Sequence, residues 1–109
     1  MRHELFTEII ARYQRHGWQL RRVLLRPETL AELKEKVPEL FPQAQLIEAD
    51  FDALWFARPS HAGREAWELR HVSAQPYALF ETFEADEDEE LRAEARLEME
   101  NQMREYALK

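Results

Sequence analysis

The sequence predicts an α+β fold in which helices pack on a mostly antiparallel sheet of four strands. The two ends of the chain carry apolar residues at the three- and four-residue spacing of amphipathic helices. Between them, several short segments show partial two-residue alternation, the period of a β-strand. A proline-bounded segment interrupts these strands and predicts a further helix. The expected order is α-β-α-β-β-β-α in a single domain of 109 residues.

The first helix is predicted over residues 3–16. Its apolar stripe consists of Leu5, Phe6, Ile9, Ile10 and Tyr13. Gly17 follows at the position where a helix C-cap favours a residue that tolerates positive φ. Residues 18–26 then predict the first strand. One strand face would carry Trp18, Leu20 and Leu24, and the other Val23 and Leu25.

A second, short helix is predicted over residues 28–37. Pro27 suits its first turn, where no N–H donor is needed, and Pro38 ends it. Its inward-facing residues would be Leu30, Leu33 and Val37.

The last three strands are predicted over residues 45–58, 64–72 and 76–85 as an antiparallel meander. The loop PSHAG, residues 59–63, joins the first two of these strands. We expect this hairpin to place Trp55 opposite Trp67, and the same register places Asp52 opposite Arg70.

A long C-terminal helix is predicted over residues 87–108, with a length of about 33 Å. Asp86 would cap it, and Glu89 would complete a capping box. Its apolar stripe would be Leu91, Ala95, Met99, Met103 and Tyr106.

The composition excludes several classes of site. The chain has no cysteine, which removes disulfides, thiolate metal sites and thiol nucleophiles. No apolar run approaches the roughly 18 residues of a membrane helix. Glu4 and Glu8 interrupt the N-terminal segment, which therefore does not resemble a signal peptide. We expect a cytoplasmic protein that does not enter a membrane.

The net charge of −7 is unevenly distributed along the chain. Residues 1–26 carry +4, residues 27–80 carry −4 and residues 81–109 carry −7. The basic and acidic ends could meet within one monomer or across a dimer. The overall charge argues against nucleic-acid binding. One hypothesis is nevertheless that RNA or a phosphorylated partner binds to a cluster of arginines near two aromatic residues. The arginines are Arg12, Arg15, Arg21, Arg22 and Arg26.

Three carboxylates, Glu48, Asp50 and Asp52, fall at alternate positions of the second predicted strand. The simplest interpretation is the solvent-exposed face of that strand, with Asp52 paired across the sheet. The alternative is a divalent-metal site made by Asp50, Asp52 and Glu68, because Mg²⁺ prefers carboxylate oxygens.

The order of Asp52 and Glu68-Leu69-Arg70 resembles the nuclease superfamily whose motif is Asp followed by Glu-x-Lys. The resemblance covers only these few residues and implies a metal-dependent hydrolase or nuclease. The chain departs from the motif at Arg70, which stands in place of the lysine and does not release a proton at usable pH.

Other signs of catalysis are weak in this sequence. The four histidines show no helical metal-pair spacing, and no glycine-rich phosphate loop is present. We therefore expect a protein without enzymatic activity and without a cofactor.

The leading functional hypothesis rests on apolar residues that fall on both faces of the predicted sheet. Either helices would cover both faces, or one face would contact another chain together with the last helix. The residues expected to form this contact surface are Leu54, Phe56, Tyr77, Phe80, Met99 and Met103. The expected function is a small acidic protein-interaction module of a chaperone-, adaptor- or immunity-like kind. We expect a homodimer with a protein partner, and its acidic surface suits a basic partner.

Overall fold

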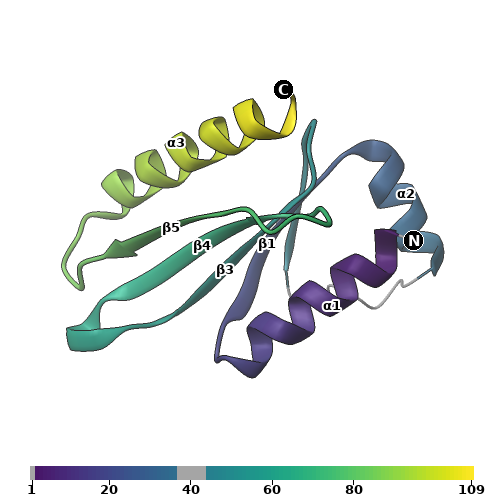
Figure 1. Cartoon of the computed structure of the whole chain (residues 1–109). Helices are drawn as coiled ribbons and strands as arrows, with labels where there is room; N and C mark the ends of the chain where they lie inside the picture. Colours follow the sequence, from purple (N-terminus) through teal and green to yellow (C-terminus); the bar gives the residue numbers. More distant parts are fainter. Residues whose placement is uncertain (1, 37–43) are drawn as a thin grey trace.

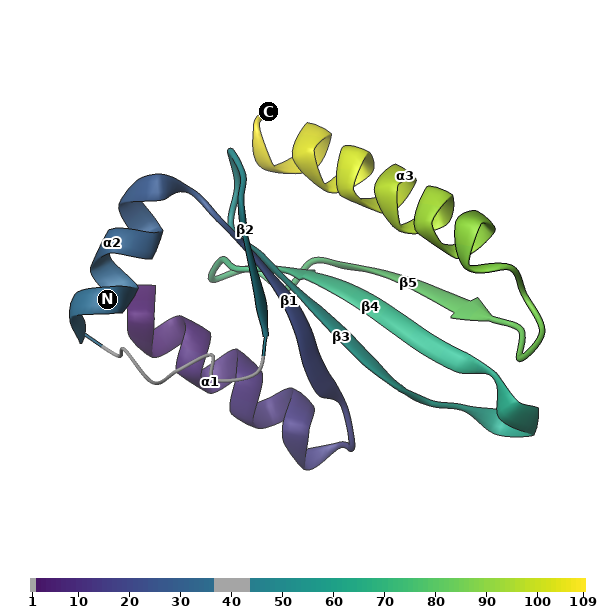
Figure 2. The same cartoon turned by 180° about the vertical axis from the view of Figure 1, so that it is seen from behind.

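A computed structural model of the chain describes residues 2–36 and 44–109. A five-stranded sheet forms the centre, with α1 and α2 on one face and α3 on the other (Figures 1 and 2). The α+β class is confirmed, although the sheet has five strands and not four. In chain order the elements are α1 (Arg2–Arg15), β1 (Gln19–Leu25), α2 (Pro27–Lys36), β2 (Gln45–Glu48), β3 (Ala53–Pro59), the 3₁₀ turn η1 (His61–Gly63), β4 (Glu65–His71), β5 (Ala78–Phe83) and α3 (Glu89–Ala107).

The extra strand arises where one continuous strand was expected over residues 45–58. The chain bends at residues 49–52, so that β2 and β3 lie on opposite sides of β1 in the strand order β2-β1-β3-β4-β5. The β1–β2 pair is parallel, and all other pairs are antiparallel. Helix α2 supplies the crossover that a parallel pair requires. Two residues expected in or after α2, Val37 and Pro38, lie outside the described residues.

Two apolar layers hold the helices on the sheet. On the α1 face the buried residues are Phe6, Ile9, Ile10, Trp18, Val23, Leu25, Leu33, Leu54, Phe56, Ala66 and Val72. On the α3 face they are Leu24, Phe51, Ala53, Trp55, Ala57, Trp67, Leu69, Phe83, Met99 and Met103. The amphipathic stripes predicted for the two terminal helices are thus the faces that pack, except that Leu91 of α3 is 54% exposed.

A β-bulge in β1 changes which of its residues share a face. Leu20 lies opposite Phe56 and Arg22 lies opposite Trp55, so Arg21 is the extra residue of the bulge. Beyond the bulge the alternation is shifted by one position. Trp18 and Leu20 therefore face α1 whereas Leu24 faces α3, and the prediction that these three share one face is wrong.

The β3–β4 hairpin pairs two residues away from the expected register. Trp67 lies opposite Ala57 and not opposite Trp55. The turn is centred on Ala62, which has a φ of +60°. Because side chains alternate with a period of two, a shift of two residues preserves the faces. Trp55 and Trp67 accordingly still meet, edge to face, with ring centroids 5.7 Å apart.

The helix ends follow local capping chemistry. Gly17 has a φ of +85° after α1, as predicted for a C-cap glycine. The N-cap of α3 is Asp88, whose Oδ1 accepts from the backbone N–H of Glu90 at 3.4 Å, and not Asp86 as expected. No helix in residues 2–36 and 44–109 is long and apolar enough to cross a membrane.

Candidate functional site

The three carboxylates at alternate sequence positions do not form one row in the folded chain. Glu48 ends β2 and is exposed. Asp50, in the bend at residues 49–52, is also exposed and accepts a hydrogen bond from Nε of Arg104 at 3.0 Å. Asp52 points into the interior and is only 3% exposed. The expectation of a solvent-exposed row is therefore wrong for Asp52, because the bend turns its side chain inward.

Asp52 joins the start of α2 to the start of β3. Its carboxylate accepts hydrogen bonds from the backbone N–H of Arg26 at 2.9 Å, from Nη2 of Arg26 at 3.2 Å and from the Thr29 hydroxyl at 2.9 Å. Arg70, the partner expected for it, lies opposite Leu54. These contacts fix the first turn of α2 against the sheet, so Asp52 has a structural role.

The alternative metal site is not assembled by the fold. Glu68 lies opposite Phe56 of β3. Phe56 is four residues beyond Asp52 in the chain, which corresponds to about 13 Å of extended strand. Its carboxylate accepts a hydrogen bond from the Tyr13 hydroxyl, while Asp50 pairs with a residue of α3. In the part of the chain that the structure describes, no group of three or more His, Asp or Glu side chains could hold a metal ion.

Four of the six residues expected on a contact surface lie in the interior. Leu54 and Phe56 are 0% exposed beneath α1, and Met99 and Met103 pack between α3 and the sheet. This corrects the expectation of an open apolar sheet face. Both faces are apolar because both are covered by helices.

The other two residues, Tyr77 and Phe80, reach the surface to different degrees. Tyr77 is half-buried, and its ring stacks on Tyr106 of α3 with centroids 3.7 Å apart. Phe80 is 59% exposed and meets the ring of Trp18 edge-on at 6.4 Å. It lies opposite Glu68 on the α1 side of the sheet. Phe80 is therefore the one member of the expected surface that a partner could reach fully.

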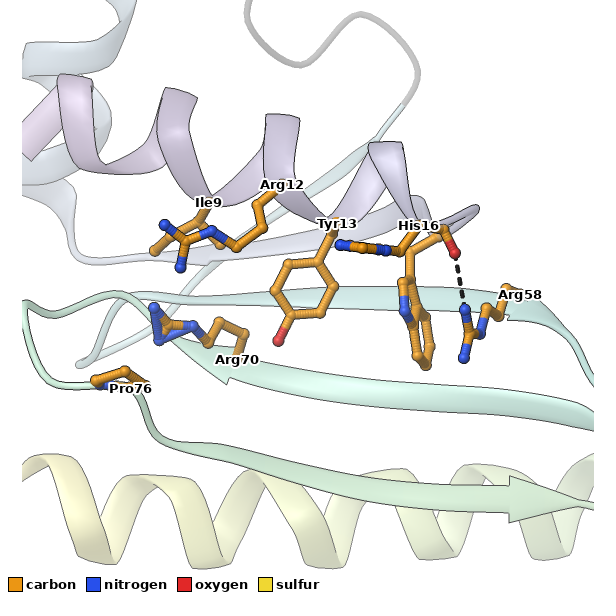
Figure 3. A pocket seen from close by; sticks show the side chains of 8 residues that line it. Ile9, Arg12, Tyr13, His16, Arg58, Arg70 and Pro76 are labelled. Carbon is orange, nitrogen blue, oxygen red and sulfur yellow. Dashed lines mark hydrogen bonds between the residues drawn. The ribbon is translucent and has the colours of Figure 1, made fainter.

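A pocket of about 430 Å³ opens between α1 and the sheet (Figure 3), and Trp18, which lines it, contacts Phe80. Arg12 and Tyr13 extend from α1 toward the strands, and Arg70 lies below Arg12 in this view. The pocket is lined by Ile9, Arg12, Tyr13, His16, Trp18, Arg58, Arg70 and Pro76. Its volume is within the usual range of small-ligand sites. We call these eight residues together with Phe80 the α1 groove.

Three arginines give the α1 groove a cationic character in an otherwise acidic protein. Arg58 donates to the backbone carbonyl of His16 at 2.7 Å, and its guanidinium lies 4.5 Å from the ring centroid of Trp18. Arg70 is only 7% exposed and donates to the backbone carbonyl of its neighbour His71 at 3.2 Å. Arg12 lies at the exposed side of the groove.

None of these three arginines forms an ion pair with a described carboxylate. Burial of an unpaired guanidinium is unfavourable, because the charge loses hydration without gaining a counterion. Arg70 is therefore the most unusual charge of the groove.

Tyr13 closes the inner wall of the pocket. Its ring stacks on Phe56 with centroids 4.0 Å apart, and its hydroxyl donates to Glu68. Burial, and then the hydrogen bond and negative charge of Glu68, raise the pKa of the Tyr13 phenol well above its ordinary value. The phenol therefore stays protonated at physiological pH and serves as a fixed donor to Glu68.

The N-terminal arginines are scattered in the folded chain and do not form one basic surface. Arg26 pairs with Asp52, and Arg22 lies 6.0 Å from the ring centroid of Trp67 on the α3 side of the sheet. Arg12 is on the α1 side, which α3 does not cover. Among the described side chains, no ion pair joins these arginines to α3, so α3 does not neutralise the groove within one monomer.

Sequence reasoning missed Arg58 and Arg70 as functional candidates. They come from the end of β3 and from β4, far from Arg12 in sequence, and only the hairpin and α1 bring them together. The available signal was Arg70 in an otherwise alternating strand, where an inward position is normally apolar.

Comparison of the chain with protein-family models, with curated proteins and with solved structures finds no match.

Proposed function

We propose that the protein is a non-enzymatic protein-interaction module whose working surface is the α1 groove. The observation that carries this proposal is Phe80, a large aromatic residue that is 59% exposed and touches Trp18 at the edge of a ready-formed pocket. A single exposed apolar residue is ordinary on a protein surface. An exposed aromatic residue that continues into a pocket is a typical anchor point for a partner chain.

The residue types of the groove support binding between proteins. Tryptophan, tyrosine and arginine are the residues that dominate the energetics of protein–protein contacts. The groove combines Trp18 and Tyr13 with Arg12, Arg58 and Arg70. The sequence-based hypothesis of an interaction module is thus kept, but its surface moves from the buried Leu54–Phe56 face to the α1 groove.

The same residues argue for binding over catalysis. The lining of the pocket contains no Ser, Thr or Cys that could act as a nucleophile. Arginine does not serve as a general base at usable pH. Burial, and then the hydrogen bond with Glu68, raise the pKa of the Tyr13 phenol, which disfavours the phenolate that could act as a base or nucleophile.

Photocrosslinking at Phe80 tests the proposal. The photoreactive amino acid p-benzoylphenylalanine, itself aromatic, replaces Phe80 in cells of the organism that encodes the chain. The matched control places the same amino acid at Leu97 on α3, which is 58% exposed and far from the groove. We expect an adduct with a defined protein from position 80 and none from position 97.

The identity of the adduct adds a second result. An adduct with another copy of the chain shows that the protein binds itself. Sedimentation velocity then measures the fraction of dimer in solution directly. Absence of an adduct at position 80, or equal adducts at both positions, would contradict the proposal.

A further inference from the structure

Two arginines of the α1 groove, Arg12 and Arg70, have the properties of a site prepared for an anion. Arg70 is 7% exposed and pairs with no described carboxylate, and the neighbouring carboxylate, Glu68, is engaged by the Tyr13 hydroxyl. Arg12 extends from α1 toward Arg70 at the same end of the pocket, whereas Arg58 lies at the other end, beyond Trp18 (Figure 3). An incoming anion would complete the hydrogen bonding of the Arg12 and Arg70 guanidinium groups.

The charge of the site fits a single negative charge better than a double one. Around the Tyr13 phenol the charged neighbours are two guanidinium groups, those of Arg12 and Arg70, and one carboxylate, that of Glu68. This leaves one positive charge without a counterion at this end of the pocket, while Arg58 donates to the His16 carbonyl at the other end. No helix N-terminus or glycine-rich loop lines the pocket, although both are common parts of phosphate sites. A carboxylate, whose planar oxygens match a guanidinium fork, fits these features.

The walls of the pocket select an apolar group next to that carboxylate. The rings of Tyr13 and Trp18 lie 6.0 Å apart between centroids, and Phe80 and Pro76 extend this wall toward β5. A ligand that places a carboxylate on the arginines would therefore bring an adjacent apolar side chain onto aromatic surface.

We propose that the α1 groove binds an acidic segment of a partner protein in which a carboxylate stands next to an apolar side chain. This inference rests on the proposed function and names the chemistry of the partner. It replaces the sequence-based expectation of a basic partner for this surface, since the groove itself is cationic.

A pair of small probes tests this chemistry without knowledge of the partner. N-acetyl-L-phenylalanine carries a carboxylate beside a phenyl ring, and N-acetyl-L-phenylalaninamide is its neutral counterpart. Each is titrated into the ¹⁵N-labelled full chain, and NMR shifts of the Trp18 indole N–H and the Arg58 Nε–H are followed. We expect the acid to bind with a Kd of about 1 mM and the amide to bind at least about tenfold more weakly.

Matched variants locate the site. Arg70→Gln and Arg12→Gln each remove one charge from the anion site, and the exposed side chain of Arg12 makes its variant safe for folding. Arg15→Gln removes an exposed charge from the same helix outside the pocket. We expect the two groove variants to lose binding of the acid by about tenfold or more and the control to retain it.

Three results would overturn the inference. They are no shift up to about 20 mM acid, equal binding of acid and amide, and inorganic phosphate binding as tightly as the acid. The segment captured by photocrosslinking at Phe80 supplies the test of the partner. An adduct with a basic or neutral segment overturns the inference and leaves the proposed function intact. Absence of any adduct removes the proposed function, while the acid–amide comparison still decides the chemistry of the pocket.

Discussion

Replacement of Asp52 by asparagine tests whether this buried carboxylate fixes the first turn of α2 against the sheet. The side chain of Asp52 is 2% exposed, and it accepts hydrogen bonds from the Arg26 backbone, the Arg26 guanidinium and the Thr29 hydroxyl. Asparagine keeps the shape and one acceptor oxygen, but it loses the negative charge and directs an NH₂ group toward these donors.

The size of the effect follows from burial. Removing one partner of a fully buried ion pair costs about 3–5 kcal/mol. The Arg26 side chain is 37% exposed, so water can hydrate the guanidinium that loses its partner. We therefore expect Asp52→Asn to lower the free energy of unfolding by about 2–3 kcal/mol, and Tm by about 8–12 °C.

Asp50→Asn is the matched control for this measurement. Asp50 and Arg104 are 55% and 45% exposed, and an exposed pair of this kind contributes about 0–1 kcal/mol. Urea unfolding followed by circular dichroism gives both free energies of unfolding. Equal destabilisation by the two variants would refute the reasoning. A Tm rise of several degrees with Mg²⁺ in the wild type would instead indicate a metal bound to the native state.

Two further predictions concern the core and the groove. Phe56→Ala removes a side chain that is 0% exposed and should lower the free energy of unfolding by about 3–5 kcal/mol. Phe80→Ala removes an exposed side chain and should change this free energy by less than about 0.5 kcal/mol. Urea unfolding measures both values. Because the pKa of Tyr13 is higher in the folded chain than in the unfolded one, its contribution to stability is complete below pH about 10 and is lost as the pH rises further. Tyr13→Phe should therefore weaken the alkaline loss of stability, and an unchanged alkaline unfolding profile would contradict this assignment.

The class of fold and the inward faces of its helices were predictable, because they depend on apolar periodicity. The stripe that includes Phe6 and Ile9 in α1, and Met99 and Met103 in α3, is the packed face in each helix. The face assignment of β3 and β4 was also predictable despite the error in register, because an error of two residues preserves the alternation.

The differences between the predicted and the observed strands have particular physical causes. The bulge at Arg21 shifts the alternation of β1, and no glycine marks it in the sequence. The hairpin centre is displaced because Ala62 adopts a positive φ that alanine rarely takes. The bend before β3 is held by tertiary contacts of Asp52 with Arg26, which no local pattern indicates.

The candidate site was the least predictable part. Its arginines come from α1, β3 and β4, and their placement around one pocket depends on the hairpin register and on the position of α1 over the sheet. The sequence indicated that apolar residues fall on both faces of the sheet. It could not show that helices cover both faces and leave Phe80 exposed.

The central claim is that the α1 groove is the surface that binds another protein. Its most direct test is the affinity of the partner captured at position 80, measured by calorimetry for Phe80→Ser and for the equally exposed Leu97→Ser. We predict that Phe80→Ser weakens binding about 30-fold, the effect of losing an anchor residue of an interface, and that Leu97→Ser leaves the affinity unchanged. Equal affinities of wild type and Phe80→Ser would contradict the claim.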